Sequence, residues 1–434
     1  MPKRLCRWGV TLGAGLLSLL MVVPAHAALP VEGAAATAGY WLRADGDRPL
    51  LSAQETAAFT RASTVRGITH ELTAAGKSRS GDVLRAQIHA AAQGLDDALP
   101  ELYAGDRLLG TEQWQNVCDN CAVDAIGGRI KVRPAAALHR ADVRLLPTGE
   151  GWYEAPDDER YDALQGTVLD PGEAVLLLHY STDGRFAFVE TRDYHGWVDA
   201  RALAAADWET WRAFAAPKEF FTVMAADFGR EEWGLLYQMG AKIPGRRAAD
   251  GTLRLLLPAR GAEGELAVRE ARLPDDGRLR AGRLPLTRNN LIRLAFAPLS
   301  SEYGWGGENN GMDCSSYVQN IYRAMGVELP RDADMQERAC SLLPLAGLSA
   351  AERCALLAEV PPGALLFRPG HVMLYLGQDM GGTPLVIHDI SSYYEDGEKK
   401  YIRQVVVSTL AFQNESGTAA IDTLTAIGLI APAP

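Results

Sequence analysis

Three residues in the last third of the sequence have the types and spacing that nucleophilic catalysis by cysteine requires. Cys314 follows an aspartate, and His371 and His388 lie further along the chain on two segments with strand-like patterns. A cysteine nucleophile needs a base within hydrogen-bond reach and a third group that orients the base. We therefore expect Cys314 to be the nucleophile, His371 the acid and base, and His388 the residue that orients the His371 ring.

The element that must present Cys314 is a helix over residues 315–325. Asp313 is a suitable N-cap and Gly326 a suitable stop. The unpaired N–H groups of a first helical turn favour an anion, so we expect the Cys314 thiolate to form more easily than that of a cysteine in mid-helix. One face of the predicted helix is apolar, with Val318, Ile321, Tyr322 and Met325.

The two histidines belong to a predicted sheet. Short strand patterns occur at residues 364–367, 371–377, 385–390 and 402–408. A helix followed by an antiparallel sheet is an α+β layout. On adjacent strands, His371 and His388 can meet on one face.

We place this α+β domain at residues 283–434. The sequence pattern of the chain upstream of it changes several times. Residues 28–124 are rich in Ala and contain a capping box at Ser52–Glu55, which predicts a helical N-terminal region. Residues 125–210 alternate with period two, and the runs at 173–180 and 185–191 flank a Ser-Thr-Asp-Gly turn. This pattern predicts a hairpin in a small β-barrel. Weaker strand patterns predict a second small barrel over residues 211–282.

The first 27 residues read as a cleaved signal peptide. A basic start with Lys3, Arg4 and Arg7 precedes an apolar run over 9–23 and the small-x-small site Ala25-His26-Ala27. The run is shorter than the about 20 apolar residues of a membrane span. We therefore expect a periplasmic or secreted protein without stable membrane insertion.

Export gives the cysteines a specific meaning, because thiols outside the cytosol tend to be oxidised. We expect Cys340 and Cys354 to form a disulfide, whose loop of about 15 residues would contribute about 3 kcal/mol. Two separate buried thiols are the alternative. The pair Cys118 and Cys121 is interpreted as a structural disulfide or as plain thiols, because no further zinc ligands lie nearby.

Composition excludes several classes of protein. The chain has 47% apolar and 22% charged residues, as soluble globular proteins do. The formal charge of -11, from 54 acidic and 43 basic residues, lacks the positive surface that a nucleic-acid backbone requires. We expect no nucleic-acid partner.

The motifs around the nucleophile resemble one known family. The resemblance rests on Tyr303-Gly304-Trp305-Gly306-Gly307, Asp313-Cys314-Ser315, Leu329-Pro330-Arg331 with Gln336, the strand Gly363-Ala364-Leu365-Leu366-Phe367, and His371-Val372. This ordered set is similar to the NlpC-type cysteine peptidases, papain-like enzymes that cut bacterial peptidoglycan peptides. The helical region and two SH3-like barrels also resemble the architecture of that family's γ-D-glutamyl-L-diamino acid endopeptidases. Four positions depart from the family pattern, Ser316, Ala333, Ala364 and Met373.

The resemblance implies a reaction and its site. The expected reaction is hydrolysis of the γ-D-glutamyl-L-diamino acid bond of peptidoglycan stem peptides through an acyl-enzyme. The oxyanion would be held by the Cys314 N–H, to which the resemblance adds the Tyr303 hydroxyl. The implied substrate-binding residues are Tyr303, Trp305, Asp313 and Ser315, with Asp313 facing the free amine of an N-terminal L-Ala. No metal or organic cofactor is expected, because every step uses side chains.

Two other functions fit the same features. One is a cell-wall-binding protein whose catalytic domain is inactive. The other is an amidase or acyltransferase on the same Cys-His machinery.

Overall fold

The computed structural model describes residues 29–93, 95, 101–156 and 158–431. The predicted signal peptide lies outside these residues. Within the described part of the chain, no helix combines the length and apolarity needed to cross a membrane.

The C-terminal part is built on a six-stranded antiparallel sheet in the order β19-β24-β20-β21-β22-β23. The strands are β19 Ser341–Pro344, β20 Leu365–Arg368, β21 His371–Gln378, β22 Pro384–Glu395, β23 Glu398–Thr409 and β24 Ala426–Leu429. The four predicted strands correspond to β20 to β23, of which β22 and β23 are longer than expected. The helices are α7 Arg288–Phe296, α8 Cys314–Ala324, α9 Ala333–Ala339, α10 Ala350–Glu359 and α11 Ala420–Thr423.

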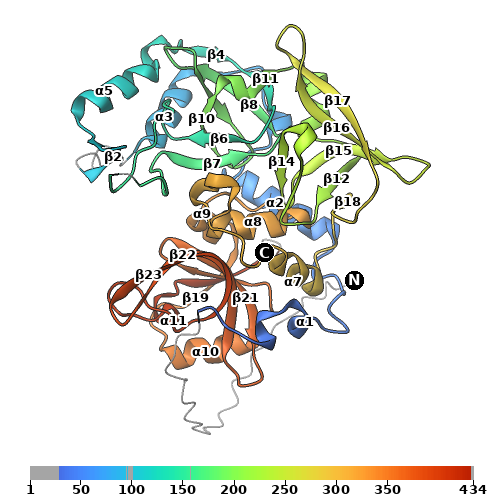
Figure 1. Cartoon of the computed structure of the whole chain (residues 1–434), viewed down its shortest axis with the longest axis vertical. Coiled ribbons are helices and arrows are strands. Elements are labelled where there is room, and N and C mark those ends of the chain that lie inside the picture. The colour runs from blue at the N-terminus through green and yellow to red at the C-terminus, as the bar shows by residue number, and fades with distance from the viewer. Residues whose placement is uncertain (1–28, 94, 96–100, 157, 432–434) are drawn as a thin grey trace, which may run out of the picture.

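This sheet separates two hydrophobic cores, because successive side chains of a strand point to opposite faces. Val372 and Leu374 of β21 pack in one core with Val318 of α8. Met373 of β21 packs in the other core with Leu357 of α10. Helices α8 and α9 therefore lie between the sheet and the β-domains, as Figure 1 shows, and α10 covers the far face.

The predicted first barrel is a seven-stranded antiparallel sheet in the order β11-β5-β8-β9-β10-β6-β7. Its strands are β5 Arg133–Ala137, β6 Ala141–Arg144, β7 Gln165–Leu169, β8 Ala174–Tyr180, β9 Phe186–Glu190, β10 His195–Asp199 and β11 Leu203–Ala205. The predicted hairpin is β8 and β9, which pair around the Ser-Thr-Asp-Gly turn. Trp152 and Trp197 are fully buried in its core.

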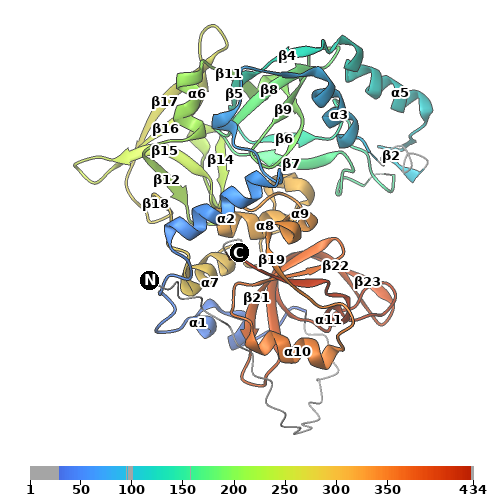
Figure 2. The same cartoon turned by 180° about the vertical axis from the view of Figure 1, so that it is seen from behind.

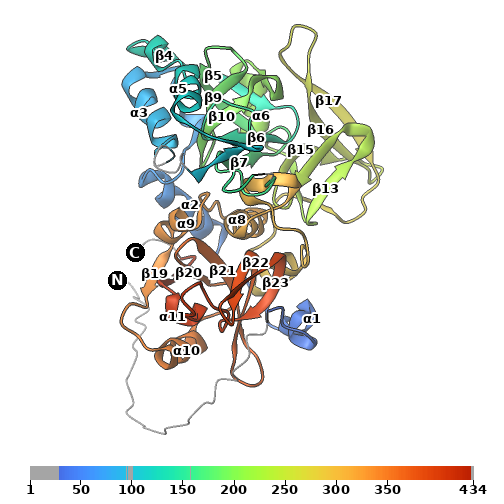
Figure 3. The ribbon, with the colours of Figure 1, turned by 60° about the vertical axis from the view of Figure 1, so that its left-hand side comes forward.

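A second β-domain follows helix α6, Trp208–Ala215, whose N-cap is Asp207. Its five-stranded sheet has the order β17-β16-β15-β12-β18. The strands are β12 Phe220–Val223, β15 Lys242–Arg247, β16 Leu253–Arg260, β17 Leu266–Leu273 and β18 Leu279–Ala281, with a separate hairpin of β13 Asp227–Arg230 and β14 Leu235–Gln238. The long β16–β17 hairpin projects from this domain in Figure 3.

The N-terminal region contains helices, but its residues divide between two cores. Trp41 and Phe59 pack in the core that contains α8, whereas Leu84 and Ile88 pack with the first barrel. Figure 2 shows α2 running beside α8. The helices are α1 Ala38–Trp41, α2 Ala53–Val65, α3 Gly81–Ala91 and α5 Thr111–Asn120. Two short antiparallel strand pairs accompany them. Strand β1 Ser78–Ser80 pairs with β4 Arg129–Lys131, and β2 Tyr103–Ala104 pairs with β3 Arg107–Leu108. The predicted capping box of α2 is present.

The expected disulfide between Cys340 and Cys354 is wrong, because both residues are free thiols. Cys340 is buried in the core on the α8 side of the sheet. Cys354 lies on α10, which packs on the opposite side. The spacing of 14 residues along the chain is compatible with a disulfide, but Cys340 and the helix that carries Cys354 pack on opposite faces of the sheet.

Candidate active site

Cys314 is the first residue of α8 and lies against the start of β21. Asp313 caps the helix by a capping box, in which its Oδ1 accepts the Ser316 N–H at 2.9 Å and the Ser316 Oγ accepts the Asp313 N–H at 2.8 Å. The Val372 N–H faces Cys314 and acts to lower the pKa of its thiol. Because Val372 follows His371, this contact brings the nucleophile and the predicted base to one place.

In this closed site the pKa of Cys314 is raised, so the effect predicted for the helix N-terminus is outweighed, while the comparison with a mid-helix cysteine stays a prediction. Burial, and then the Asp313 carboxylate, raise the pKa of Cys314 to about 12, although the Val372 N–H and Arg331 act in the other direction. Desolvation and a neighbouring negative charge therefore outweigh the favourable field of the helix N-terminus. Cys314 is held as a neutral thiol.

The two predicted histidines are in direct contact. His371 Nε2 and His388 Nδ1 are 2.7 Å apart, and His388 Nε2 lies 2.9 Å from the Ser408 Oγ. Burial, and then Arg368, lower the pKa of His371 to about 3, and burial and His371 lower that of His388. Both rings are therefore neutral at physiological pH. In the tautomer that leaves His371 Nδ1 free to accept a proton, its Nε2–H donates to His388, and His388 Nε2–H donates to Ser408.

Asp313 and Ser315, both expected to bind substrate, are buried in a hydrogen-bond network with Arg331. The Asp313 side chain accepts hydrogen bonds from the Gly306 N–H at 3.0 Å, the Ser315 hydroxyl at 3.1 Å, and Arg331. Arg331 also donates to the Ser315 hydroxyl. Burial alone would raise the pKa of Asp313, but Arg331 and the Ser316 bonds lower it below its ordinary value. The Asp313 side chain is 6% exposed, so these partners cover most of its surface.

Tyr303 and Trp305 lie at the mouth of the site. Burial, then Cys314 and Asp313, raise the pKa of Tyr303, so its hydroxyl keeps the proton that an oxyanion-hole donor needs. Trp305 is 43% exposed. Both line one hollow together with Arg160 and Tyr161 of the first barrel and Arg403 of β23.

The first barrel forms a wall of the site by packing on the glycine-rich loop at residues 304–311. The Glu308 carboxylate accepts the Tyr161 and Asp162 N–H groups at 3.1 Å each, and the Gln165 side chain donates to the Gly306 carbonyl at 3.2 Å. Gly306 has φ +57° and lies so close to Gln165 that a Cβ would approach its Cγ to 2.6 Å. This loop therefore needs glycine both for its backbone and for the contact with the barrel.

Sequence reasoning gave no role to three polar residues at the site. Ser408 and Arg331 complete the networks above. Asp389, next to His388, has both carboxylate oxygens buried without a hydrogen-bond partner among the described residues. Burial, and then Asp313, raise its pKa well above the ordinary value. The available signal for Ser408 is a single hydroxyl at the end of the apolar run Val405-Val406-Val407.

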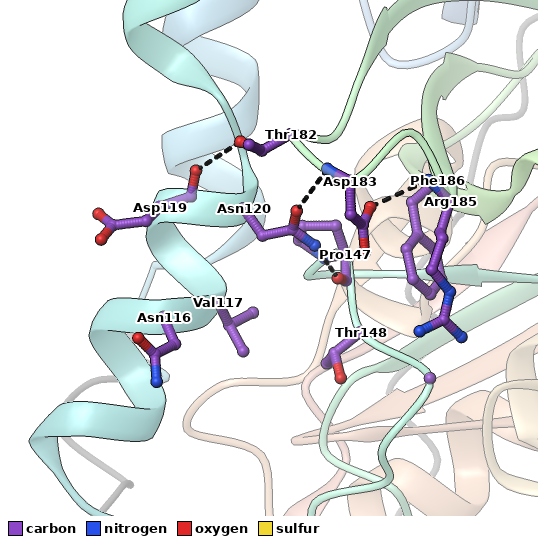
Figure 4. A pocket seen from close by; sticks show the side chains of 11 residues that line it. Asn116, Val117, Asp119, Asn120, Pro147, Thr148, Thr182, Asp183, Arg185 and Phe186 are labelled. Carbon is purple, nitrogen blue, oxygen red and sulfur yellow. Dashed lines mark hydrogen bonds between the residues drawn. The ribbon is translucent and has the colours of Figure 1, made fainter.

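A larger cavity, of about 360 Å³, lies between α5 and the first barrel and contains none of the predicted catalytic residues. Figure 4 shows that its polar groups bond to one another across the gap. The Asn120 side chain donates to the Pro147 carbonyl at 2.9 Å and accepts the Asp183 N–H at 3.2 Å. The Thr182 hydroxyl donates to the Asp119 carbonyl at 3.0 Å. These bonds fasten α5 to the barrel.

Comparison with known proteins agrees with this layout. A model of the NlpC/P60 family matches residues 300–408, and a model of the SH3 domain (SH3b1 type) matches residues 152–199. The structure of an NlpC/P60 endopeptidase from Photobacterium damselae subsp. piscicida superposes on this chain with a TM-score of 0.73 at 15% identity, and the match covers 91% of this chain and 97% of that chain. This likeness establishes a shared fold across the two β-domains and the C-terminal part that contains α8.

Two curated proteins are similar to shorter stretches. Dipeptidyl-peptidase 6 of Lysinibacillus sphaericus is 29% identical over 130 residues, 28% of this chain and 42% of that protein. The γ-D-glutamyl-L-lysine dipeptidyl-peptidase of Bacillus subtilis (strain 168) is 34% identical over 92 residues, 21% of this chain and 30% of that protein. The alignments thus span less than half of either relative. By its matched segments and its fold, the chain carries an NlpC/P60 domain of papain-like architecture behind an SH3 domain of the SH3b1 type.

Proposed function

We propose that the protein is an exported cysteine endopeptidase that hydrolyses the γ-D-glutamyl-L-diamino acid bond of peptidoglycan stem peptides. The observation that carries this proposal is the contact of His371 with His388 beside a cysteine at a helix N-terminus. The similarity to the γ-D-glutamyl-L-lysine dipeptidyl-peptidase of Bacillus subtilis supports the choice of bond. The proposed location is the periplasm or the exterior of the cell.

In the proposed mechanism, the proton leaves Cys314 during attack rather than before it. The thiol and the His371 ring are both neutral at rest, because the pKa of the thiol is about 12 and that of the imidazole about 3. As the sulfur bonds to the γ-carbonyl carbon, His371 Nδ1 takes the thiol proton. His388 accepts the His371 Nε2–H and holds the ring in the required orientation.

The tetrahedral intermediate carries its negative charge on the former carbonyl oxygen. The Cys314 N–H at the start of α8 and the Tyr303 hydroxyl are the proposed donors to this oxygen. His371 then returns its proton to the amine of the diamino acid as the C–N bond breaks. Water, deprotonated by His371, attacks the thioester, and the second collapse releases the γ-glutamyl product and the thiol.

We further propose that the enzyme prefers stem peptides with a free N-terminal L-Ala. The reason is steric, since Arg160 and Tyr161 of the first barrel stand beside Tyr303 and Trp305 at the mouth of the site. A glycan linked to the L-Ala amine would have to pass this wall. A direct bond from the Asp313 carboxylate to the amine, which the family resemblance implies, stays a separate prediction.

Mass spectrometry of products from defined muropeptides tests the proposal. The expected products of L-Ala-γ-D-Glu-diamino acid are the free diamino acid and L-Ala-D-Glu. Absence of turnover would instead favour a wall-binding protein, and cleavage between sugar and peptide or acyl transfer would favour an amidase or acyltransferase. For the preference, the free-amine peptide should have a kcat/KM at least about 10-fold above its N-acetylated form, which equals about 1.4 kcal/mol.

A further inference from the structure

The hollow beside Tyr303 contains a cation that the catalytic mechanism does not use. Arg403 of β23 lies next to Tyr303, since its carbonyl accepts the Tyr303 N–H at 2.9 Å. Its backbone has φ +49°, a left-handed conformation that is rare for a residue with a long side chain. Such local strain occurs most often at functional sites.

The Arg403 side chain contacts two tyrosines, and its guanidinium carbon lies 5.9 Å from the centre of the Tyr161 ring. Its Nε–H donates to the Tyr161 hydroxyl at 3.1 Å, and its guanidinium carbon lies 4.2 Å from the centre of the Tyr401 ring. Among the residues that the structure describes, the two terminal nitrogens have no acceptor and the guanidinium has no carboxylate within 4.0 Å. The planar fork of an arginine fixed in this way matches the two oxygens of a carboxylate.

The acidic groups in the hollow and next to it already have partners. Both oxygens of Glu308 accept backbone N–H groups of the first barrel, and burial raises its pKa to about 7. Glu302 pairs with Arg160 at 2.8 Å, but that pair is exposed, at 44% for the arginine and 63% for the glutamate, and is therefore weak. A carboxylate that approaches the hollow from solvent meets the guanidinium groups of Arg403 and Arg160, and the lining residues described contain no unbound anion.

We propose that Arg403, with Arg160 beside it, binds a carboxylate of the stem-peptide substrate. The inference rests on the proposed function and adds a specificity-determining residue to it. A stem tripeptide with meso-diaminopimelate has three carboxylates, namely the α-carboxylate of D-Glu, the C-terminal carboxylate and the side-chain carboxylate of the diamino acid. All three have the same chemistry, so the experiment must separate them.

The test is calorimetric binding in a Cys314→Ala background, which does not depend on turnover. The parent probe is L-Ala-γ-D-Glu-meso-diaminopimelate, and three analogues each lose one carboxylate, by D-isoglutamine, by a C-terminal amide and by L-Lys in place of the diaminopimelate. Arg403→Gln should raise the Kd of the parent at least about 10-fold, as expected for one charge-assisted hydrogen bond. For the analogue that lacks the recognised carboxylate, the substitution should change Kd less than about 2-fold.

The controls make the result specific. Arg246→Gln removes the same charge at an exposed position of the second β-domain and should leave all four Kd values unchanged. Arg403→Lys should recover part of the parent's affinity, since it keeps the charge but not the fork. The proposal is overturned if Arg403→Gln changes all four Kd values equally or not at all, or if the parent does not bind. Cleavage of the parent by the unmodified enzyme is a separate result, so a failure of the proposed function can be told apart.

Discussion

The buried ion pair of Asp313 with Arg331 is expected to hold the nucleophile's helix in place. The two side chains are 6% and 3% exposed. Arg331→Ala removes the guanidinium and leaves a buried carboxylate whose remaining donors are the N–H groups of Gly306 and Ser316 and the Ser315 hydroxyl. Removing one partner of a buried pair costs about 3–5 kcal/mol.

The matched control is an exposed pair of similar geometry. Arg272 and Glu270 on β17 are 2.9 Å apart, but their side chains are 56% and 43% exposed. Exposed pairs contribute about 0–1 kcal/mol. Arg272→Ala should therefore change the free energy of unfolding little, whereas Arg331→Ala should lower it by about 3 kcal/mol or more.

The assay is urea unfolding of both variants, followed by tryptophan fluorescence and near-UV circular dichroism. A third variant, Arg331→Met with Asp313→Asn, removes both charges and keeps a good N-cap, so it should regain at least half of the lost stability. The reasoning is refuted if Arg331→Ala and Arg272→Ala fall within about 1 kcal/mol of each other. It is also refuted if the double variant is as unstable as Arg331→Ala, because the loss then comes from packing rather than from an unpaired charge.

Three further expectations follow from the site and its surroundings. Asp389 has a folded-state pKa above its unfolded value, so its contribution to stability is complete at low pH and decreases as the pH rises above about 3.8 toward the folded pKa. The gain in Tm from Asp389→Asn should therefore grow between pH 4 and pH 8. A gain in Tm that does not depend on pH would contradict this expectation. Gly306→Ala should lower kcat/KM at least about 10-fold, because the new methyl group clashes with the first barrel in addition to the cost of a positive φ. The control is Gly277→Ala, since Gly277 has φ +82° but open space around it, and this variant should leave kcat/KM unchanged. Alkylation of the denatured protein without reductant should label both Cys340 and Cys354, and recovery of a peptide pair linked through them would show that the sheet does not keep them apart.

The parts of the fold that the sequence predicted are those with a local signal. The helix expected at residues 315–325 is α8, Cys314–Ala324, because its apolar face and its N-cap both lie within a few turns of the chain. The β8–β9 hairpin could also be predicted from the sequence, because its turn residues lie directly between two runs with strand-like patterns. The pairing of β19 with β24 carries no such signal, as these strands are far apart in the sequence.

The errors at the site come from tertiary burial. A helix N-terminus favours a thiolate, but the local pattern does not reveal that Cys314 is desolvated and lies beside a charged Asp313. Likewise, the motif that contains Arg331 was recognised without its pairing to Asp313, which depends on how the chain returns to α8. Spacing along the chain suggested the disulfide, and the faces of the sheet exclude it.

The most direct test of the account compares the kinetics of Cys314→Ala and His371→Ala with those of Cys354→Ala on L-Ala-γ-D-Glu-diamino acid. Cys354→Ala removes a half-buried thiol on α10, outside the site, and should leave kcat/KM within about 2-fold of the unmodified enzyme. Cys314→Ala and His371→Ala should each lower it at least about 10³-fold with unchanged circular dichroism, and His388→Ala should lower it less. A Cys314→Ala protein that releases the diamino acid at nearly the unmodified rate would contradict the assignment of Cys314 as the nucleophile.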